Sequence, residues 1–358
     1  MDRERQMTST GRQRSPSKLI GMIDSSRSTL WSQLVQWGSA LALLAIMGGC
    51  GSSGSSTSPS WKTNTGYVLQ PRFEEGSSYA VETTMDQTMN MVVMGRSLEV
   101  DQRQSMVHRY DVRDRAADGT ITLDYTTTRV RGETSMPAMG RSMSYDSEDT
   151  TASGQAGRMS RRMRSMTGHT ISARLSPQGS VRAVTGVEAL LDSLAAVEQD
   201  STQAQVLRRM MGPDAVRQQL NLSFGVYPDR PVSVGDTWTD ESAVRLGVPM
   251  QIKATYTLDS IRSTQAVIDA RMDLSPVEGD STIQMGGMSM KMNLTGDMEG
   301  KILLDVPSGL PSESTLRMEM SGTGTVERGP ATQGSSMEME LKSEGTIERK
   351  IRAREKER

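Results

Sequence analysis

Hydrophobic and polar residues alternate with a period of two through most of the chain after about residue 66. This alternation is typical of antiparallel sheets that bury one face and expose the other to water. It therefore predicts a series of paired strands. The apolar positions that share a face are Ile252, Ala254, Tyr256 and Leu258; Ala266, Ile268, Ala270, Met272 and Leu274; Met288, Met290, Met292 and Leu294; Leu316, Met318 and Met320; and Met337, Met339 and Leu341.

The first half of the chain carries the same signal in shorter segments. Residues 79–83 and 121–125 alternate between apolar and polar side chains. Asp118-Gly119 stands just before the second of these segments. An Asp-Gly pair beside alternating residues is a strong hairpin signal, so a tight turn is expected there.

One interval changes to a helical period. Between residues 186 and 222 the apolar spacing becomes three and four, which predicts short helices. A second stretch at 201–211 ends at Gly212-Pro213, and a third helix is expected over 214–222 with the proline near its first turn. The residues that define the first helix are Val187, Leu190, Leu191, Leu194 and Val197.

These patterns predict a mainly β (α+β) fold: a curved antiparallel sheet or half-barrel with two to three short helices inserted at 187–222. The helices are expected on the concave side of the sheet. A single β-rich domain is predicted over 66–350, followed by a frayed charged tail at 351–358. Polar residues 146–165 include several arginines and leave two interpretations open. They form a basic patch for anionic lipid, or an exposed strand or loop with solvated charges.

The N-terminal segment resembles an export signal. Residues 38–49 are apolar, too short a run to span a bilayer as a helix, and basic residues precede them. Met47-Gly48-Gly49-Cys50 resembles the lipobox of bacterial lipoproteins. The resemblance implies a signal peptide at 1–49, acyl chains such as palmitate on Cys50, and a flexible Gly/Ser tether at 50–65. Met1, Met7 and Met22 all remain open as the start.

The same resemblance predicts where the protein is held. Gly51, rather than aspartate, follows the cysteine. This implies a lipid anchor in the cell outer membrane, with the chain facing the periplasm. Sorting between inner and outer membrane stays open.

Composition limits the chemistry that the chain can carry. It has 28 Met but only two Phe, so methionine must fill much of the core. The single cysteine excludes an internal disulfide and a Cys-based zinc site, and only His108 and His169 could serve a His-rich metal site. A net charge of −2 gives no footprint for nucleic acid. We find no catalytic motif and expect no enzyme activity, no cofactor and no metal.

The methionine-rich strands are the candidate ligand-binding surface. Adaptable thioether side chains on one face of a sheet suit a lipid or another hydrophobic ligand. Two alternatives remain open: a structural or interaction lipoprotein with a fully packed core, and copper binding, because thioethers select Cu(I). The candidate residues are Met288, Met290, Met292, Met318, Met320, Met337 and Met339.

A short motif suggests a family. Residues 231–238 read Pro-Val-Ser-Val-Gly-Asp-Thr-Trp, a strand, a Gly-Asp turn and an aromatic anchor. The motif is similar to that of an uncharacterised family of bacterial lipoproteins with a domain of unknown function. Further similarities lie at Ser176-Pro177, Gly179 and Pro307-Ser308-Gly309. The resemblance implies a β-rich fold with a helical insert and no assigned activity. Protein partners and oligomeric state stay unknown.

Overall fold

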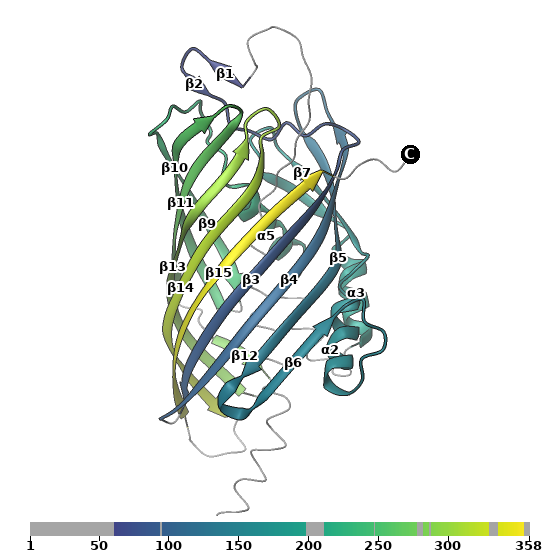
Figure 1. Cartoon of the computed structure of the whole chain (residues 1–358), viewed down its shortest axis with the longest axis vertical. Coiled ribbons are helices and arrows are strands. Elements are labelled where there is room, and N and C mark those ends of the chain that lie inside the picture. Colours follow the sequence, from purple (N-terminus) through teal and green to yellow (C-terminus); the bar gives the residue numbers. More distant parts are fainter. Residues whose placement is uncertain are drawn as a thin grey trace, which may run out of the picture.

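The alternating segments pair into one large antiparallel sheet in the computed structural model (Figure 1). The structure describes residues 61–93, 95–197, 211–246, 248–277, 282–285, 288–328 and 336–353. The elements are β1 (Lys62–Thr63), β2 (Gly66–Tyr67), β3 (Ser78–Val93), β4 (Arg96–Arg115), β5 (Ile121–Met136), the 3₁₀ turn η1 (Pro137–Met139), β6 (Arg141–Asp146), α2 (Gly154–Arg164), β7 (Thr170–Leu175), β8 (Val181–Thr185), α3 (Val187–Val197), α5 (Pro213–Phe224), β9 (Thr237–Leu246), β10 (Val248–Arg262), β11 (Gln265–Pro276), β12 (Thr282–Met285), β13 (Met288–Asp305), β14 (Leu310–Arg328) and β15 (Ser336–Ala353).

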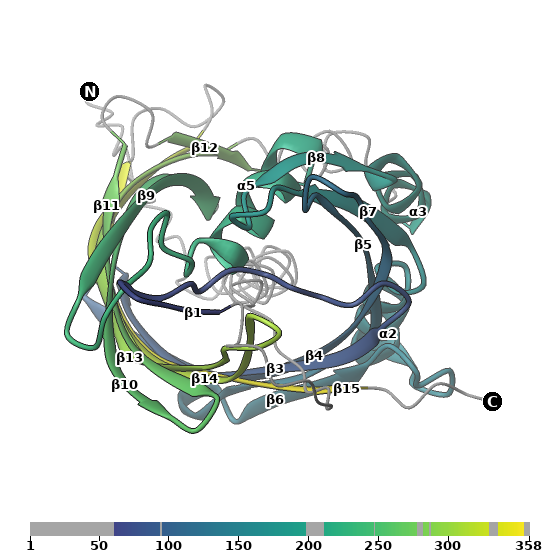
Figure 2. The same ribbon diagram turned by 90° about the horizontal axis from the view of Figure 1, so that it is seen from above.

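The sheet curves around on itself without closing. Its strand order is β8-β7-β5-β4-β3-β15-β14-β13-β11-β10-β9, with β6 and β12 paired beside β5 and β13. In the part of the chain that the structure describes, the end strands β8 and β9 do not pair with each other, and α5 packs against both. The backbone N–H of Val181 in β8 donates to Asn221 Oδ1 of α5 at 2.6 Å. Figure 2 shows α5 between the two edges. The predicted curved antiparallel sheet is confirmed.

The two faces of the sheet differ in chemistry. The face predicted for residues 252–258 is buried, with Leu258 fully enclosed and Ile252 1% exposed. On the outer face, charged side chains pair across neighbouring strands. These ion pairs include Arg103–Asp86, Arg131–Glu82, Lys253–Glu241, Arg271–Glu299, Lys301–Asp269 and Lys350–Glu313. The apolar face is therefore the inner one, and the outer face suits water.

The backbones of β13 and β14 approach each other closely at one glycine. Gly300 of β13 lies opposite Leu316 of β14. A Cβ atom at Gly300 would stand 1.9 Å from the carbonyl oxygen of Thr315, closer than any real contact. Only glycine permits this approach of β13 to β14.

A segment of the chain crosses one end of the curved sheet. Residues 68–77 run beside the 306–310 loop, as the purple segment in Figure 2 shows. Leu69, Phe73 and Leu310 are at most 1% exposed there. The hydroxyl of Tyr227, from the loop after α5, donates to the carbonyl oxygen of Gly309 at 2.6 Å. Apolar packing and this hydrogen bond therefore cap the end of the sheet.

The helices follow the prediction with one correction. α3 and α5 form where the helical period predicted them, and 198–210, including most of the second predicted stretch, lies outside the described residues. The exposed strand or loop predicted for 146–165 is wrong over residues 154–164, which form the helix α2. Met159 and Met163, four residues apart, are buried on one side of this helix. The arginines that dominated the sequence pattern masked this apolar stripe.

Ordered pairing extends past both predicted limits of the domain. β1 begins at Lys62, and the rings of Trp61 and Tyr67 stack with centroids 6.2 Å apart. β15 continues through Ala353. Cys50 and the proposed signal peptide lie outside the described residues. Within the described part of the chain, no helix is long and apolar enough to cross a membrane.

Candidate functional site

The inner face of the sheet is polar on one side. The inward residues of β10, β11, β13 and β14 are almost all apolar, whereas β3, β4, β5 and β15 place polar side chains inward among apolar ones. We call this set the inner polar stripe. Its buried members are Thr83, Gln87, Gln102, Gln104, His108, Thr127, Thr134, Ser343 and Arg349.

Arg349 is the charged member of the stripe. It lies on β15, between Ser314 of β14 and Thr83 of β3 in the strand register, and is 2% exposed. Among the described residues, its neighbour is the neutral phenol of Tyr110, which interacts with the guanidinium without good hydrogen-bond geometry, and no carboxylate reaches its Nε, Nη1 or Nη2. The buried carboxylate of Asp124 does not serve it, because Arg113 and Ser172 engage that group from the outer face.

Burial alters the electrostatics of Arg349 without removing its charge. Desolvation lowers the pKa of its guanidinium to about 10, and the phenols of Tyr110, Tyr125 and Tyr227 partly oppose this effect. The side chain is therefore protonated at neutral pH. A buried cation that lacks an anionic partner costs several kcal/mol of stability. Packing alone therefore does not explain why an arginine occupies position 349.

Three aromatic rings lie close together next to the arginine. The ring centroids of His108 and Tyr125 are 4.8 Å apart, and those of Tyr110 and Tyr125 are 5.3 Å apart. His108 Nδ1 lies 3.2 Å from the hydroxyl oxygen of Thr127, while Nε2 has no partner in the described structure. Burial, followed by the positive charge of Arg349, lowers the pKa of His108 to about 3. The imidazole is therefore neutral, and Arg349 carries the positive charge of this cluster.

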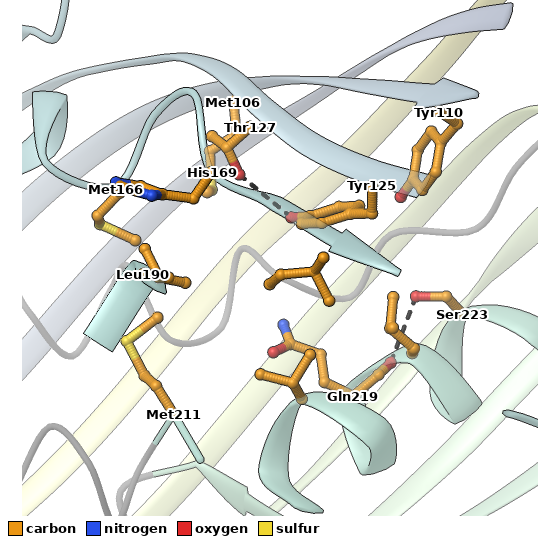
Figure 3. A pocket seen from close by; sticks show the side chains of 13 residues that line it. Met106, Tyr110, Tyr125, Thr127, Met166, His169, Leu190, Met211, Gln219 and Ser223 are labelled. Atoms are coloured by element: carbon orange, nitrogen blue, oxygen red, sulfur yellow. Dashed lines mark hydrogen bonds between the residues drawn. The ribbon is translucent and has the colours of Figure 1, made fainter. Parts of the chain in front are cut away.

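A pocket lies between the rings of Tyr110 and Tyr125 and the helices α3 and α5 (Figure 3). Tyr110 and Tyr125 contribute from the sheet, Leu190 from α3, and Gln219 from α5. The free space is about 50 Å³, room for one or two water molecules. Met106, Met166 and Met211 also line it. Because methionine side chains adapt readily, the wall can change shape around a larger occupant.

Strand pairing brings the predicted methionines into rows on the sheet. In the register, Met292, Gly324 and Met339 are consecutive partners across β13, β14 and β15, and Met318 and Met320 are buried on β14. Met290, Val326 and Met337 form the next row, and Met288 begins β13. The side chains of Met288, Met290 and Met337 lie outside the described structure.

The sequence prediction did not include the inner polar stripe. The signal was present, because Gln102, Gln104 and His108 share the inward parity of β4 with Met106 and Tyr110. Of these three, the sequence analysis considered only His108. His108 is in fact 1% exposed. No group of three or more His, Cys, Asp and Glu that could hold a metal occurs among the described residues, and copper binding by methionines remains untested.

The fold and this interior define a class of protein: a curved, unclosed antiparallel sheet with a water-facing outer surface and a largely apolar inner one. A model for a family of unknown function, DUF6263, matches residues 118–311, more than half of the chain. The chain belongs to this family. The predicted resemblance to an uncharacterised family is thus confirmed, while the lipobox lies outside the matched range.

Comparisons with other proteins add no functional assignment. No curated protein sequence matches the chain. Lipovitellin, described in a structure of its lipid–protein interactions, aligns with a TM-score of 0.44 and 11% identity, over 79% of this chain and 25% of its own. The chain thus spans about a quarter of the lipovitellin chain. The outer membrane protein OprG from Pseudomonas aeruginosa scores 0.19 at 6% identity, over 78% and 98% of the two chains. A DUF1329 family protein from Desulfovibrio piger scores 0.12 at 11%, over 76% and 85%. Scores this low carry no argument about function.

Proposed function

We propose that this chain is a bacterial envelope lipoprotein that binds or carries a hydrophobic ligand against the inner face of its sheet. It is held to the outer membrane by acyl chains on Cys50, and it faces the periplasm. It acts by binding rather than by catalysis. The proposal concerns one site, the apolar inner face of β10 to β14 together with the pocket beside Tyr125.

The contrast between the two faces of the sheet carries this proposal. Outward positions hold cross-strand ion pairs such as Lys301–Asp269, with Nζ and Oδ1 2.5 Å apart. Inward positions on the neighbouring strands hold Met298, Ile302 and Met318, each fully buried. A sheet with this arrangement shields an apolar interior from water. This is the arrangement that a carrier of apolar molecules needs.

The length of the wall supports an interior that can hold a ligand. About eight strands enclose a space that side chains alone can fill. The path from β8 to β9 has eleven strands, and α5 spans the remaining gap. A wall of this girth encloses more space than an eight-stranded one.

Photo-crosslinking in intact cells tests the proposal. The full chain would carry p-benzoylphenylalanine in place of inward-facing Met318 or, as the matched control, outward-facing Glu319. After irradiation, we expect lipid adducts on the Met318 variant, detected by mass spectrometry of the purified protein, and none on the Glu319 variant. Equal adducts at both positions, or none at Met318, would contradict a hydrophobic ligand in the interior.

The small pocket volume supports one alternative function. About 50 Å³ of free space is well below the roughly 300 Å³ at which ligand pockets begin. A structural or interaction lipoprotein with a packed core would show this value. The crosslinking experiment separates the two, because a packed interior gives protein–protein crosslinks within the chain and no lipid adduct.

A further inference from the structure

We infer that the ligand is an amphiphile with a single anionic head group, and that the guanidinium of Arg349 binds this head. The head is a carboxylate or a phosphate diester, either of which offers oxygen acceptors to an arginine. The inference rests on the proposed function, since it names the class of ligand that the interior takes.

The charge of Arg349 has no anionic partner among the described residues. Arg349 is 2% exposed, and among the described residues its three nitrogens have no anionic acceptor and no hydrogen bond of good geometry, with the neutral phenol of Tyr110 as the nearest interacting group. Its neighbours in the sheet, Thr83 and Ser314, are neutral. A guanidinium carries five N–H donors in a planar fork that matches the two oxygens of a carboxylate or phosphate. An anionic oxygen pair is therefore the partner that this position lacks.

The groups around Arg349 suit the same head. The hydroxyl of Thr83 is buried and unpartnered, and it lies on the adjacent strand. Tyr110, Tyr125 and Tyr227 are the phenols close enough to influence the charge on Arg349. Hydroxyl groups donate to anionic oxygens, so they can complete the coordination of a head that the arginine holds.

No buried carboxylate competes for the arginine. Asp124 is the acidic residue among the buried polar side chains of the described structure, and it is engaged by Arg113 and Ser172. The neutral imidazole of His108 adds no second positive charge. One cation without a counterion selects a monoanionic head over a neutral lipid.

The inner face also provides a path for the apolar chain. From Arg349, β15 continues for ten residues to Met339. At about 3.4 Å per residue this is roughly 34 Å. The hydrocarbon depth of one bilayer leaflet is roughly 15 Å, half of the core thickness. Beside this path β14 places Leu316, Met318 and Met320 inward, so an acyl chain whose head is at Arg349 would lie along apolar side chains.

The test uses the purified full chain in a nonionic detergent. It compares three photoactivatable probes with the same diazirine-bearing C16 chain: hexadecanoic acid, hexadecanol and phosphatidylglycerol. Labelling of β14 and β15 peptides is quantified by mass spectrometry. The variants are Arg349→Met and Arg349→Lys, with Arg317→Met, an exposed arginine on the outer face of β14, as the matched control. Circular dichroism reports whether each variant folds.

We expect the wild type to be labelled by an anionic probe about tenfold more than by the alcohol, the size of effect that a charge-assisted hydrogen bond gives. Arg349→Met should lose this preference and keep its labelling by the alcohol. Arg349→Lys should keep part of the preference for an anionic probe, and Arg317→Met should keep all of this preference. The stronger of the acid and phosphatidylglycerol signals identifies the head.

Two results would overturn the inference. If the acid, the alcohol and phosphatidylglycerol label the wild type equally, the head group is not recognised, although the proposed function stands. If the folded Arg349→Met variant keeps the anionic preference, another group binds the head. Absence of labelling by every probe would instead remove the proposed function itself. If Arg349→Met does not fold, the Arg349→Lys variant and the comparison of the three probes on the wild type still decide whether Arg349 recognises an anionic head.

Discussion

Arg349 and Lys350 are consecutive in β15, but they face opposite sides of the sheet. Lys350 points outward, and its Nζ lies 3.7 Å from Glu313 Oε1 on β14. Arg349 points inward and has no anionic partner within the described structure. The same charge is thus solvated and paired on one face, and buried and unpaired on the other. This pair of positions allows the cost of the buried charge to be measured directly.

Replacing Arg349 by methionine is expected to stabilise the ligand-free protein. A well-packed apolar residue in place of a buried unpaired charge is worth about 1–4 kcal/mol. Lys350→Met is the control, and it should change stability by less than about 1 kcal/mol, because an exposed ion pair contributes little. Urea unfolding at pH 7 measures both. A clear loss of stability in Arg349→Met would show that Arg349 already has a stabilising partner.

The low pKa of His108 predicts a dependence of stability on pH. In the folded state this pKa is about 3, whereas the unfolded value is near 6.5. Below about pH 6.5 the unfolded chain binds a proton that the folded protein excludes, so stability falls as the pH falls. The loss attributable to His108 is about 1.4 kcal/mol per pH unit between these two values.

His108→Gln removes this contribution and should flatten the curve of unfolding free energy between pH 6.5 and 5. Denaturant titrations at intervals of half a pH unit measure it. His169→Gln, which removes the other histidine of the chain, is the matched control. Identical slopes for the wild type and the His108 variant would show that His108 can be protonated in the folded protein.

Gly300 should tolerate no side chain. A Cβ there would meet the Thr315 carbonyl at 1.9 Å, so Gly300→Ala must separate β13 from β14 or distort both. We expect a loss of about 1–3 kcal/mol, as for overpacked cores. Gly324→Ala is the matched control on β14, where the nearest atom is the mobile Cε of Met339 at 3.2 Å. Thermal unfolding measures the stability of both variants. Equal losses of stability would contradict the close approach of β13 to β14 at Gly300.

Membrane attachment is predicted to depend on Cys50. Cys50→Ser removes the thiol that would carry the acyl group, so the protein should leave the membrane fraction or keep its signal peptide. Cell fractionation and the mass of the N-terminal peptide measure these outcomes. A Ser52→Ala variant serves as the control. Unchanged processing and membrane association in the Cys50 variant would mean that the anchor lies elsewhere.

The sequence predicted the sheet well because its signal is local. The buried face of Ile252 and Leu258, the turn at Gly119 and the helix at Leu190 all follow from residues near one another in the chain. α2 was missed, since its run of arginines hid the apolar pair Met159 and Met163.

The inner polar stripe could not be found in the same way. Arg349, Thr83 and His108 are up to 266 residues apart, and only the pairing of β15 with β3, and of β3 with β4, brings them to one place. Alternation assigns a residue to a face, but it does not say which face is inside when both contain polar side chains. In β15, Arg349 and Lys350 are both basic, so burial could be assigned only from the assembled sheet.

The gap between β8 and β9 has a mechanical consequence. In a closed barrel, strand number and register fix the diameter. Among the described residues, no backbone hydrogen bonds join the two edges, and packing of α5 completes the wall. The separation of the two edges is therefore set by the packing of α5 and by its hydrogen bond to Val181, rather than by strand number and register.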